Sequence, residues 1–349
     1  MNFSRKLITW YEVNKRELPW RETNDPYKIW LSEVILQQTR VEQGMPYYLK
    51  FIEKYPTLKK LAAAPDDEVM KLWQGLGYYS RARNMLTAAR EVMANHSGKF
   101  PNEFEEIKKL KGIGPYTAAA IASLAFGLAH AVVDGNVYRV LARIYSIDTP
   151  INSTEGATVF AKLATELLDA KNPGTHNQAV MEFGATHCKP AQPLCPDCIF
   201  NRHCVALQKG LVTQLPVKTP NAKPRTRHFN YFYLTDNKRT WLQQRTGKDV
   251  WQGLYEFPLL ESETKLDWAT LLQHDFIKTL LGKLKPVLGQ QISFTHLLSH
   301  QKIEATFFEI LLPKGFVLKK FPTFETSLTK LKSYPVSRLT DKFIESIQH

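Results

Sequence analysis

Four cysteines, the entire thiol content of the chain, lie in one short stretch with the spacing C-x6-C-x2-C-x5-C: Cys188, Cys195, Cys198 and Cys204. Four thiolates can hold a 4Fe-4S cluster or a structural zinc ion. Zinc sites usually combine two tight cysteine pairs, and only Cys195 and Cys198 form such a pair. The wide outer gaps and the apolar residues within Ala179–Phe183 therefore favour a structural 4Fe-4S cluster, with zinc as the alternative. Nothing indicates secretion, so a disulfide framework is not expected.

Two carboxylates stand at positions that could serve catalysis. Asp134 ends the apolar run Ala131–Val133 and precedes a predicted amphipathic helix. An aspartate there commonly caps the helix, but the same helix N–H groups keep a carboxylate ionised, ready to face a developing positive charge. Glu33 lies in the helical run WLSEVILQQT, where an ordinary solvated glutamate is the simpler interpretation. The residues alone leave a structural and a catalytic role open for both.

Two glycines, Gly112 and Gly114, precede a predicted helix of small residues, AAAIASLAF. Glycines before a helix leave backbone N–H groups unblocked, and the helix dipole favours an anion there. The amphipathic helix predicted around Phe104–Leu110 completes the pattern of a helix-hairpin-helix, which grips a DNA phosphate without reading sequence. A plain helix N-terminus is the alternative.

The bulk composition is that of a folded protein with an anionic partner. The chain has 349 residues, enough for two domains, and a net charge of +13 without a low-complexity basic tail. This charge favours a nucleic acid as partner, although a merely basic protein would also carry it. No apolar run approaches the roughly 20 residues of a membrane span, and the N-terminus lacks a signal-peptide core. We expect a protein of a bacterial cytoplasm, with no membrane partner.

The chain is predicted to be multidomain. An all-α domain covers residues 1–206 and includes the cysteine loop 188–204; residues 207–227 form a basic, proline-containing linker; residues 228–349 form an α+β domain. In this last domain HFNYFYL, TWLQQR and ATFFEILL read as strands, and Trp268–Leu281 reads as a helix.

Five motifs carry a resemblance to a known family. LSEVILQQT, GLGYYSRARN, LKGIGPYTA, VDGNVYRV and the cysteine spacing occur in this order and resemble the helix-hairpin-helix DNA glycosylase superfamily. Within it the chain resembles the adenine DNA glycosylases of the MutY type. One reason is the long C-terminal domain; the other is Tyr116, which stands where endonuclease III-type enzymes carry a Schiff-base lysine. Since a phenol cannot form that imine, the resemblance implies a glycosylase without efficient lyase activity.

The C-terminal domain resembles a Nudix fold in Trp251–Pro258, WQGLYEFP, but no acidic R-E-x-x-E-E box follows. The resemblance therefore implies binding without nucleotide hydrolysis. In MutY proteins this domain helps to recognise 8-oxoguanine through an F-S-H loop. This chain has Leu298-Ser299-His300, so Ser299 and His300 match and Leu298 departs, which puts the packing at that position in doubt. An ordinary inter-strand loop is the alternative.

The resemblance implies a monomeric enzyme that removes adenine opposite 8-oxoguanine or guanine in double-stranded DNA. It also implies roles for single residues in this reaction. Glu33 protonates the base at N7 and later assists water, Asp134 stabilises or captures the sugar cation, and Asn136 orients Asp134. For Glu33 to act as an acid at neutral pH, burial must raise its pKa. The adenine pocket and the DNA-contacting positions that match the family are Arg21, Leu36, Gln178, Gln38, Thr39, Leu76, Tyr78, Gly112, Gly114, Ser299 and His300.

Three other functions stay open at this point. A thymine–guanine mismatch glycosylase can also carry tyrosine at the hairpin, although it needs no module for an oxidised purine. A bifunctional pyrimidine glycosylase is disfavoured by Tyr116. A non-catalytic iron–sulfur DNA-binding protein would not need both Glu33 and Asp134.

Overall fold

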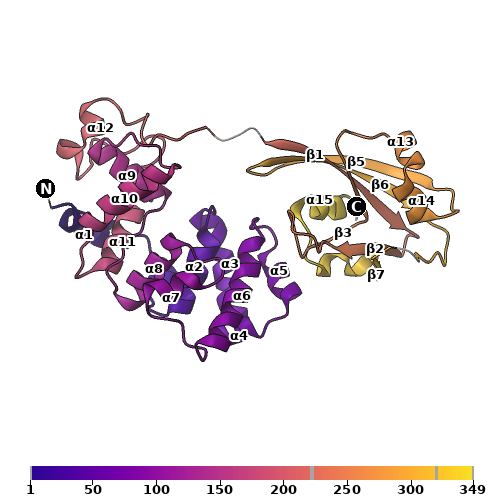
Figure 1. Ribbon diagram of the computed structural model, residues 1–349, viewed down its shortest axis with the longest axis horizontal. Coiled ribbons are helices and arrows are strands. Elements are labelled where there is room, and N and C mark those ends of the chain that lie inside the picture. Colours follow the sequence, from indigo (N-terminus) through magenta and orange to yellow (C-terminus); the bar gives the residue numbers. More distant parts are fainter. Residues whose placement is uncertain (1, 221–223, 319–320, 348–349) are drawn as a thin grey trace. The chain divides into compact units, whose positions relative to one another are not determined.

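The computed structural model describes residues 2–220, 224–318 and 321–347. The chain forms two compact units (Figure 1): residues 1–63 with 84–220, and residues 64–83 with 221–349. The segment 64–83 thus groups with the C-terminal part of the chain, which the sequence did not indicate. Lys223 of the predicted linker lies outside the described residues.

The first unit is helical, as the sequence predicts. Its elements are α1 (Phe3–Asn14), η1 (Pro19–Arg21), α2 (Pro26–Leu36), α3 (Val41–Lys54), α4 (Leu58–Ala62), most of α6 (Ser80–Asn95), α7 (Phe104–Lys109), α8 (Pro115–Phe126), α9 (Gly135–Tyr145), α10 (Thr154–Leu167), α11 (Pro173–Glu182), the π-helical turn η2 (Phe183–His187), η3 (Asn201–His203) and α12 (Val205–Gln208). No helix among the described residues is long and apolar enough to cross a membrane.

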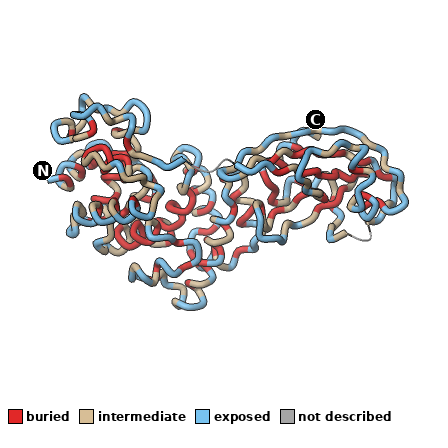
Figure 2. The backbone as a smooth tube through the Cα atoms, turned by 45° about the horizontal axis from the view of Figure 1, so that its top comes forward, coloured by how far each residue is buried: buried red, intermediate tan, exposed pale blue. Residues whose placement is uncertain are grey.

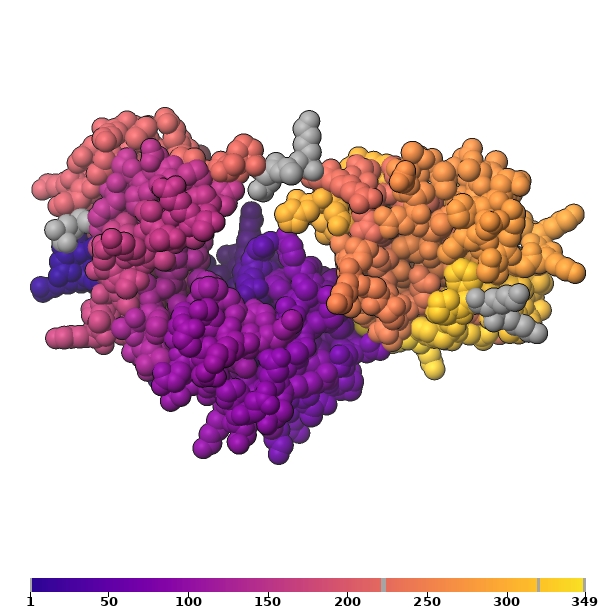
Figure 3. Space-filling view, in the orientation of Figure 1, coloured from indigo at the N-terminus to yellow at the C-terminus, as the bar shows by residue number. Residues whose placement is uncertain are grey.

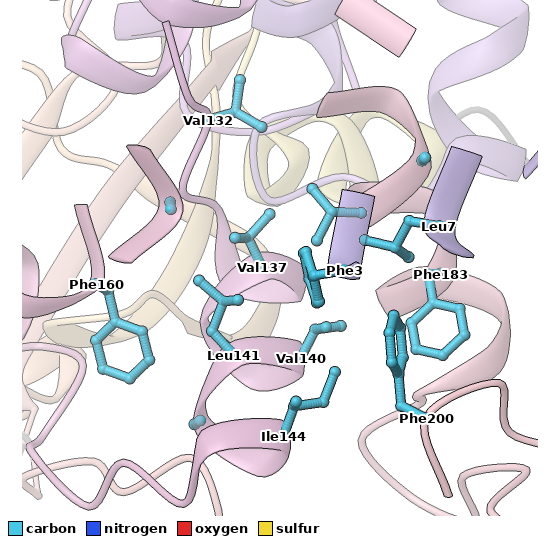
Figure 4. Packing of buried hydrophobic residues seen from close by; sticks show 14 of the residues in the cluster. Phe3, Leu7, Val132, Val137, Val140, Leu141, Ile144, Phe160, Phe183 and Phe200 are labelled. Carbon is cyan, nitrogen blue, oxygen red and sulfur yellow. The ribbon is translucent and has the colours of Figure 1, made fainter. Parts of the chain in front are cut away.

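Two central helices of this unit are built in different ways. The middle of α8, residues 117–123, is buried because its run of alanines lets neighbouring helices approach closely. α9 is amphipathic, and its apolar side chains recur at the helical period. Val137, Val140 and Ile144 project from α9 into a cluster that Phe3 and Phe183 join (Figure 4). The core therefore fixes the start of α9, where Asp134 stands.

The second unit combines α5 (Asp66–Trp73) with a sheet and four further helical segments. The strands are β1 (Arg225–Thr235), β2 (Arg239–Gln244), β3 (Tyr255–Glu256), β4 (Leu259–Ser262), β5 (Val287–Leu297), β6 (Gln301–Leu311) and β7 (Phe324–Ser327); the helices are α13 (Trp268–Gln273), α14 (Asp275–Leu281), η4 (Leu328–Ser333) and α15 (Arg338–Ser346). The strand order is β3-β2-β1-β6-β5, with β4 beside β1 and β7 beside β2; the β1–β6 pair is parallel and the other pairs are antiparallel.

Helices cover both faces of this sheet. Trp268 of α13 stacks on Phe308 with the ring centres 5.6 Å apart, whereas Phe343 of α15 stacks on Phe307 from the opposite face at 4.2 Å. Successive strand residues point to opposite faces, so Phe307 packs against the helix layer on one face of the sheet and Phe308 against the layer on the other. Buried backbone accordingly runs through the strands of this unit, as it does through the helices of the first (Figure 2).

The predicted elements of the second unit are present with two differences. The helix predicted over Trp268–Leu281 is broken at His274, which is extended and whose ring nitrogen accepts the N–H of Phe276, so that it caps α14. β1 begins at Arg225, inside the stretch predicted as linker, because its first residues pair in parallel with β6. The α+β fold is confirmed.

Candidate active site

Glu33 is buried. α2 starts at the cap Asp25, whose side chain accepts the N–H of Tyr27, and Pro26 occupies its first turn. Nearly all its residues are buried, so the helix carries Glu33 inward with only 8% of its surface exposed. The Tyr116 hydroxyl of α8 donates a hydrogen bond to Glu33 Oε2 at 2.7 Å. The simpler interpretation as a solvated glutamate is therefore wrong, because α2 lies between other helices.

This environment changes the acidity of Glu33. The pKa of Glu33 is raised from 4.5 to about 7, chiefly by burial and also by the nearby Asp134 charge, against the Tyr116 hydrogen bond and Arg21, which lower it. A glutamate of this kind titrates near neutral pH, so a substantial share carries a proton there and can transfer it, as an acid catalyst must. Tyr116 donates to one carboxyl oxygen, so the other oxygen can carry the proton.

Asp134 is held at the start of α9 by its own helix. Its Oδ1 accepts the N–H groups of Asn136 at 2.9 Å and Val137 at 2.8 Å, which confirms the predicted cap. Its Oδ2 accepts the Asn136 side-chain amide at 2.7 Å, and Arg139 in turn donates to Asn136 Oδ1 at 2.8 Å. The carboxylate orientation is therefore fixed by three donors.

Glu33, Tyr116 and Asp134 form one electrostatic group. Burial raises the Asp134 pKa, against the hydrogen bonds that lower it. Burial also raises the pKa of the Tyr116 hydroxyl strongly, and the charges of both Glu33 and Asp134 add to that rise. The Asp134 charge raises the Glu33 pKa, so double ionisation of the two buried carboxyl groups is disfavoured, and one protonated and one ionised acid is the favoured state.

Arg21 and Gln178 lie beside this group. Arg21 Nε donates to Gln178 Oε1 at 3.0 Å, and its Nη2 donates to Glu182 Oε2 at 2.7 Å. A cleft of about 560 Å³ is lined by Arg21, Gln178, Trp20 and other residues of η1 and α11, while Glu33 is not among its lining residues. Its size is within the range of small-molecule sites.

The turn between α7 and α8 has the predicted hairpin geometry. Gly112 adopts a left-handed φ of 78°, and a Cβ there would come within 2.6 Å of Asn84. Gly114 caps α8 without a side chain and is exposed, with open space around it. The turn thus needs glycine at position 112 and leaves the start of α8 accessible to an anion.

The residues after α2 form a tight turn. Thr39 N donates to the Leu36 carbonyl at 3.1 Å, and the exposed Gln38 between them has a left-handed φ of 54°. Leu36 lies against Gly44 of α3. Left-handed backbone at a residue other than glycine is sparsely populated and often marks a functional position.

Four predicted residues belong to the second unit: Leu76, Tyr78, Ser299 and His300. Tyr78 also has a left-handed φ, 46°, its side chain is about half exposed, and its hydroxyl lies 2.6 Å from Ser299 Oγ. The Tyr78 side chain is therefore not part of the buried core. Leu76 is buried, and Ser299 and His300 are exposed in the loop between β5 and β6.

The cysteine stretch lies at the surface of the first unit, beside α1 (Figure 3), where Lys6 reaches the Ile199 carbonyl at 3.4 Å. The four thiols are free. Arg143, which is buried, donates to Cys188 Sγ at 3.5 Å. Within the described residues no group of three or more His, Cys, Asp or Glu side chains is arranged to hold a metal ion. Four thiolates are the kind of ligand that binds a 4Fe-4S cluster, although the four side chains are not gathered into a metal-binding group.

Comparison with known proteins places these features in a family. Residues 31–163 match the HhH-GPD superfamily of base excision DNA repair proteins, and residues 230–346 match the NUDIX domain. The adenine DNA glycosylase of Buchnera aphidicola from Acyrthosiphon pisum is 33% identical over 269 residues, 76% of this chain and 77% of that protein. The chain belongs to the adenine DNA glycosylase family.

Other relatives of the family are longer. The Arabidopsis thaliana adenine DNA glycosylase is 38% identical over 304 residues, and the chain spans 48% of its length. The chain thus spans about half the length of the first curated relatives it matches. Among solved structures, a thermostable thymine-DNA glycosylase has a TM-score of 0.55 and 31% identity, covering 59% of this chain and 95% of that one. Endonuclease III bound to DNA, at 23% identity and a TM-score of 0.52, shares the helical fold.

Two residues near the site were missed by the sequence analysis. Glu182 has a fully buried carboxylate that binds Arg16 and Arg21, and Arg139 is buried and holds Asn136. A usable signal existed for both, because each is a charged residue within a largely apolar helical run. Charged side chains are almost never fully buried unless they are paired.

Proposed function

We propose that this protein removes adenine mispaired with 8-oxoguanine or guanine in double-stranded DNA, by hydrolysis and without efficient strand cleavage. The observation that carries the proposal is the buried Glu33, which is bonded to Tyr116 and lies within the field of Asp134. Family membership makes adenine the favoured base. The adenine must leave the stack to reach these buried groups.

The reaction uses the two carboxyl groups differently. Glu33 transfers its proton to N7 of the extruded adenine, the bond from C1′ to N9 breaks, and its electrons remain on the leaving base. The sugar becomes an oxocarbenium ion, which the ionised Asp134 faces and stabilises; this is the two-carboxylate logic of glycoside hydrolysis. Water then adds to C1′, and Glu33, now a carboxylate, accepts its proton.

Base and backbone recognition involve other residues. Arg21 has only donors, so Gln178 turns its oxygen toward Arg21 and keeps its amide N–H groups for the base. The N–H groups at Gly112 and Gly114 suit a phosphate of the DNA backbone. Leu36 joins Arg21 and Gln178 in the adenine pocket, and Gln38 and Tyr78 fill or wedge the duplex. Thr39, Leu76, Ser299 and His300 lie around the oxidised guanine.

We further propose that Cys188, Cys195, Cys198 and Cys204 hold a 4Fe-4S cluster. Burial, reinforced by the neighbouring thiols, raises the pKa of Cys198 to about 11, so an apo site favours thiols. A bound cluster would supply a fixed cross-link of this loop, and the buried Arg143 would offset its negative charge. It has no part in the bond-breaking steps.

The test is a single-turnover glycosylase assay on three duplexes, with adenine opposite 8-oxoguanine, adenine opposite guanine, and thymine opposite guanine. We expect base release from the first two, fastest opposite 8-oxoguanine, and strand breaks only after alkali. Release of thymine alone would refute the proposal and favour a thymine-DNA glycosylase activity. The chain also resembles a solved structure of a glycosylase with that name.

A further inference from the structure

The segment 64–83 lies inside the stretch that matches the glycosylase superfamily, yet it groups with the C-terminal unit. Two side chains of α5 contact that unit directly. The Tyr255 hydroxyl of β3 donates to Asp67 Oδ2 at 2.7 Å, and Lys71 Nζ donates to the Tyr334 carbonyl at 3.1 Å. Tyr79 adds a bond to the Val336 carbonyl at 3.2 Å. The segment is therefore bound to the C-terminal unit at several separate points.

The same segment carries Tyr78, which needs support from its surroundings. Tyr78 is held in left-handed backbone, a conformation that persists only where neighbouring contacts determine it. Trp73 Nε1 donates to the Gly77 carbonyl at 3.0 Å, and Arg81 donates to the Leu76 and Gly77 carbonyls at 3.2 and 3.3 Å. The Trp73 bond joins the loop to the end of α5, the Arg81 bonds join it to the first turn of α6, and these bonds do not involve Ser299.

The distance between Tyr78 and Ser299 therefore depends on where α5 sits against the sheet. The Tyr78 hydroxyl is 2.6 Å from Ser299 Oγ, and both residues are exposed, so this neutral bond adds little by itself to their spacing. The Asp67 bond, in contrast, joins a carboxylate of α5 to a side chain of the sheet. Hydrogen bonds to charged acceptors are about twice as strong as neutral ones.

Resting on the proposed function, we propose that Asp67 and Tyr255 are positioning residues for the reading of the base opposite adenine. Neither touches DNA in this role. Their hydrogen bond seats α5 on β3, and α5 then presents Tyr78 beside Ser299, the pair proposed to meet the oxidised guanine.

Local chemistry supports this role for Tyr255. Its ring lies 5.6 Å from Phe324 and 5.1 Å from Tyr334, so the aromatic cluster sets the direction of the hydroxyl. Burial and the Asp67 carboxylate together raise the pKa of Tyr255 to about 12, so the hydroxyl stays a donor. Asp67 lies in the first turn of α5, where the helix dipole favours its charge.

The test compares Tyr255→Phe with the matched control Tyr334→Phe. Both keep the ring and lose a hydroxyl, but the Tyr334 hydroxyl faces Thr326 of β7 instead of α5. The measurement is the ratio of single-turnover rates for adenine opposite 8-oxoguanine and opposite guanine. We expect Tyr255→Phe to lower this ratio about three- to tenfold through the first rate only. Tyr334→Phe keeps the wild-type ratio, and Asp67→Asn, which still accepts a hydrogen bond, lowers it less than Tyr255→Phe.

An unchanged ratio in Tyr255→Phe, or an equal loss of both rates, overturns the inference while the proposed function stands. A wild-type protein without preference for 8-oxoguanine refutes the proposed reading of the lesion, and this inference with it. Circular dichroism and urea midpoints of the two tyrosine variants confirm that they are compared in the folded state.

Discussion

Replacing Glu33 by glutamine is expected to slow catalysis severely and to stabilise the protein at alkaline pH. The glutamine side chain would keep an oxygen to accept the Tyr116 hydroxyl but has no acidic proton to give. General acid catalysis typically contributes about 10²–10⁴ in rate, or 3–5 kcal/mol of barrier. Single-turnover release of adenine should fall by at least that much, while duplex binding, measured by gel shift, persists.

The stability effect follows from the pKa. A rise from 4.5 to about 7 means that the folded state holds the Glu33 proton over a range in which the unfolded chain has lost it. The wild-type protein therefore loses stability as pH rises through this window, by about 3 kcal/mol in all. Glutamine does not titrate, so the advantage of the variant should grow by about 2.5 kcal/mol between pH 5 and pH 8.

Urea unfolding at pH 5 and pH 8 measures this difference, with Glu53→Gln as the control because Glu53 is an exposed glutamate on α3. The control keeps Glu33, so it should lose stability between pH 5 and pH 8 in parallel with the wild type. If Glu33→Gln and the wild type lose stability in parallel between these pH values, Glu33 does not hold a proton at neutral pH. Near-normal adenine release by the variant would remove Glu33 from the mechanism altogether.

Three further outcomes test the surrounding residues. Glu182→Gln leaves Arg21 without its buried counter-ion, so the positive charge of Arg21 lowers the Glu33 pKa further. The alkaline limb of the pH–rate profile should therefore move to lower pH, and an unmoved limb would contradict this. The same variant breaks a buried ion pair and should lose about 3–5 kcal/mol of stability in urea. Asn136→Ala removes the amide that holds Asp134 Oδ2, and we expect about ten- to hundredfold slower single-turnover release, whereas wild-type rates would show that the backbone donors suffice. Cys198→Ser should lower the iron content and the visible absorption of the purified protein, and stoichiometric zinc in the wild type would refute the cluster.

Local features of the site were accessible from the sequence because a few consecutive residues decide them. Asp134 was predicted as a cap and is one, since its acceptors and the N–H groups of Asn136 and Val137 lie within three residues. The glycine turn before α8, the helical first unit and three strands of the second, β1, β2 and β6, follow from short patterns of the same kind. Composition and periodicity also distinguished the helical part from the α+β part, but they did not indicate that residues 64–83 group with the latter.

The tertiary structure decided which charges are buried and which distant residues meet. Glu33 reads as a solvated glutamate in its own helix, and only Tyr116, 83 positions later, and the packing of α2 convert it into an acid with a raised pKa. Arg21 and Glu182 meet across 161 positions, and Tyr78 meets Ser299 across 221. Burial depends on the sum of contacts from separate elements, so no local window of the sequence contains it. The motifs name the reactive groups, and the packing sets their protonation and their partners.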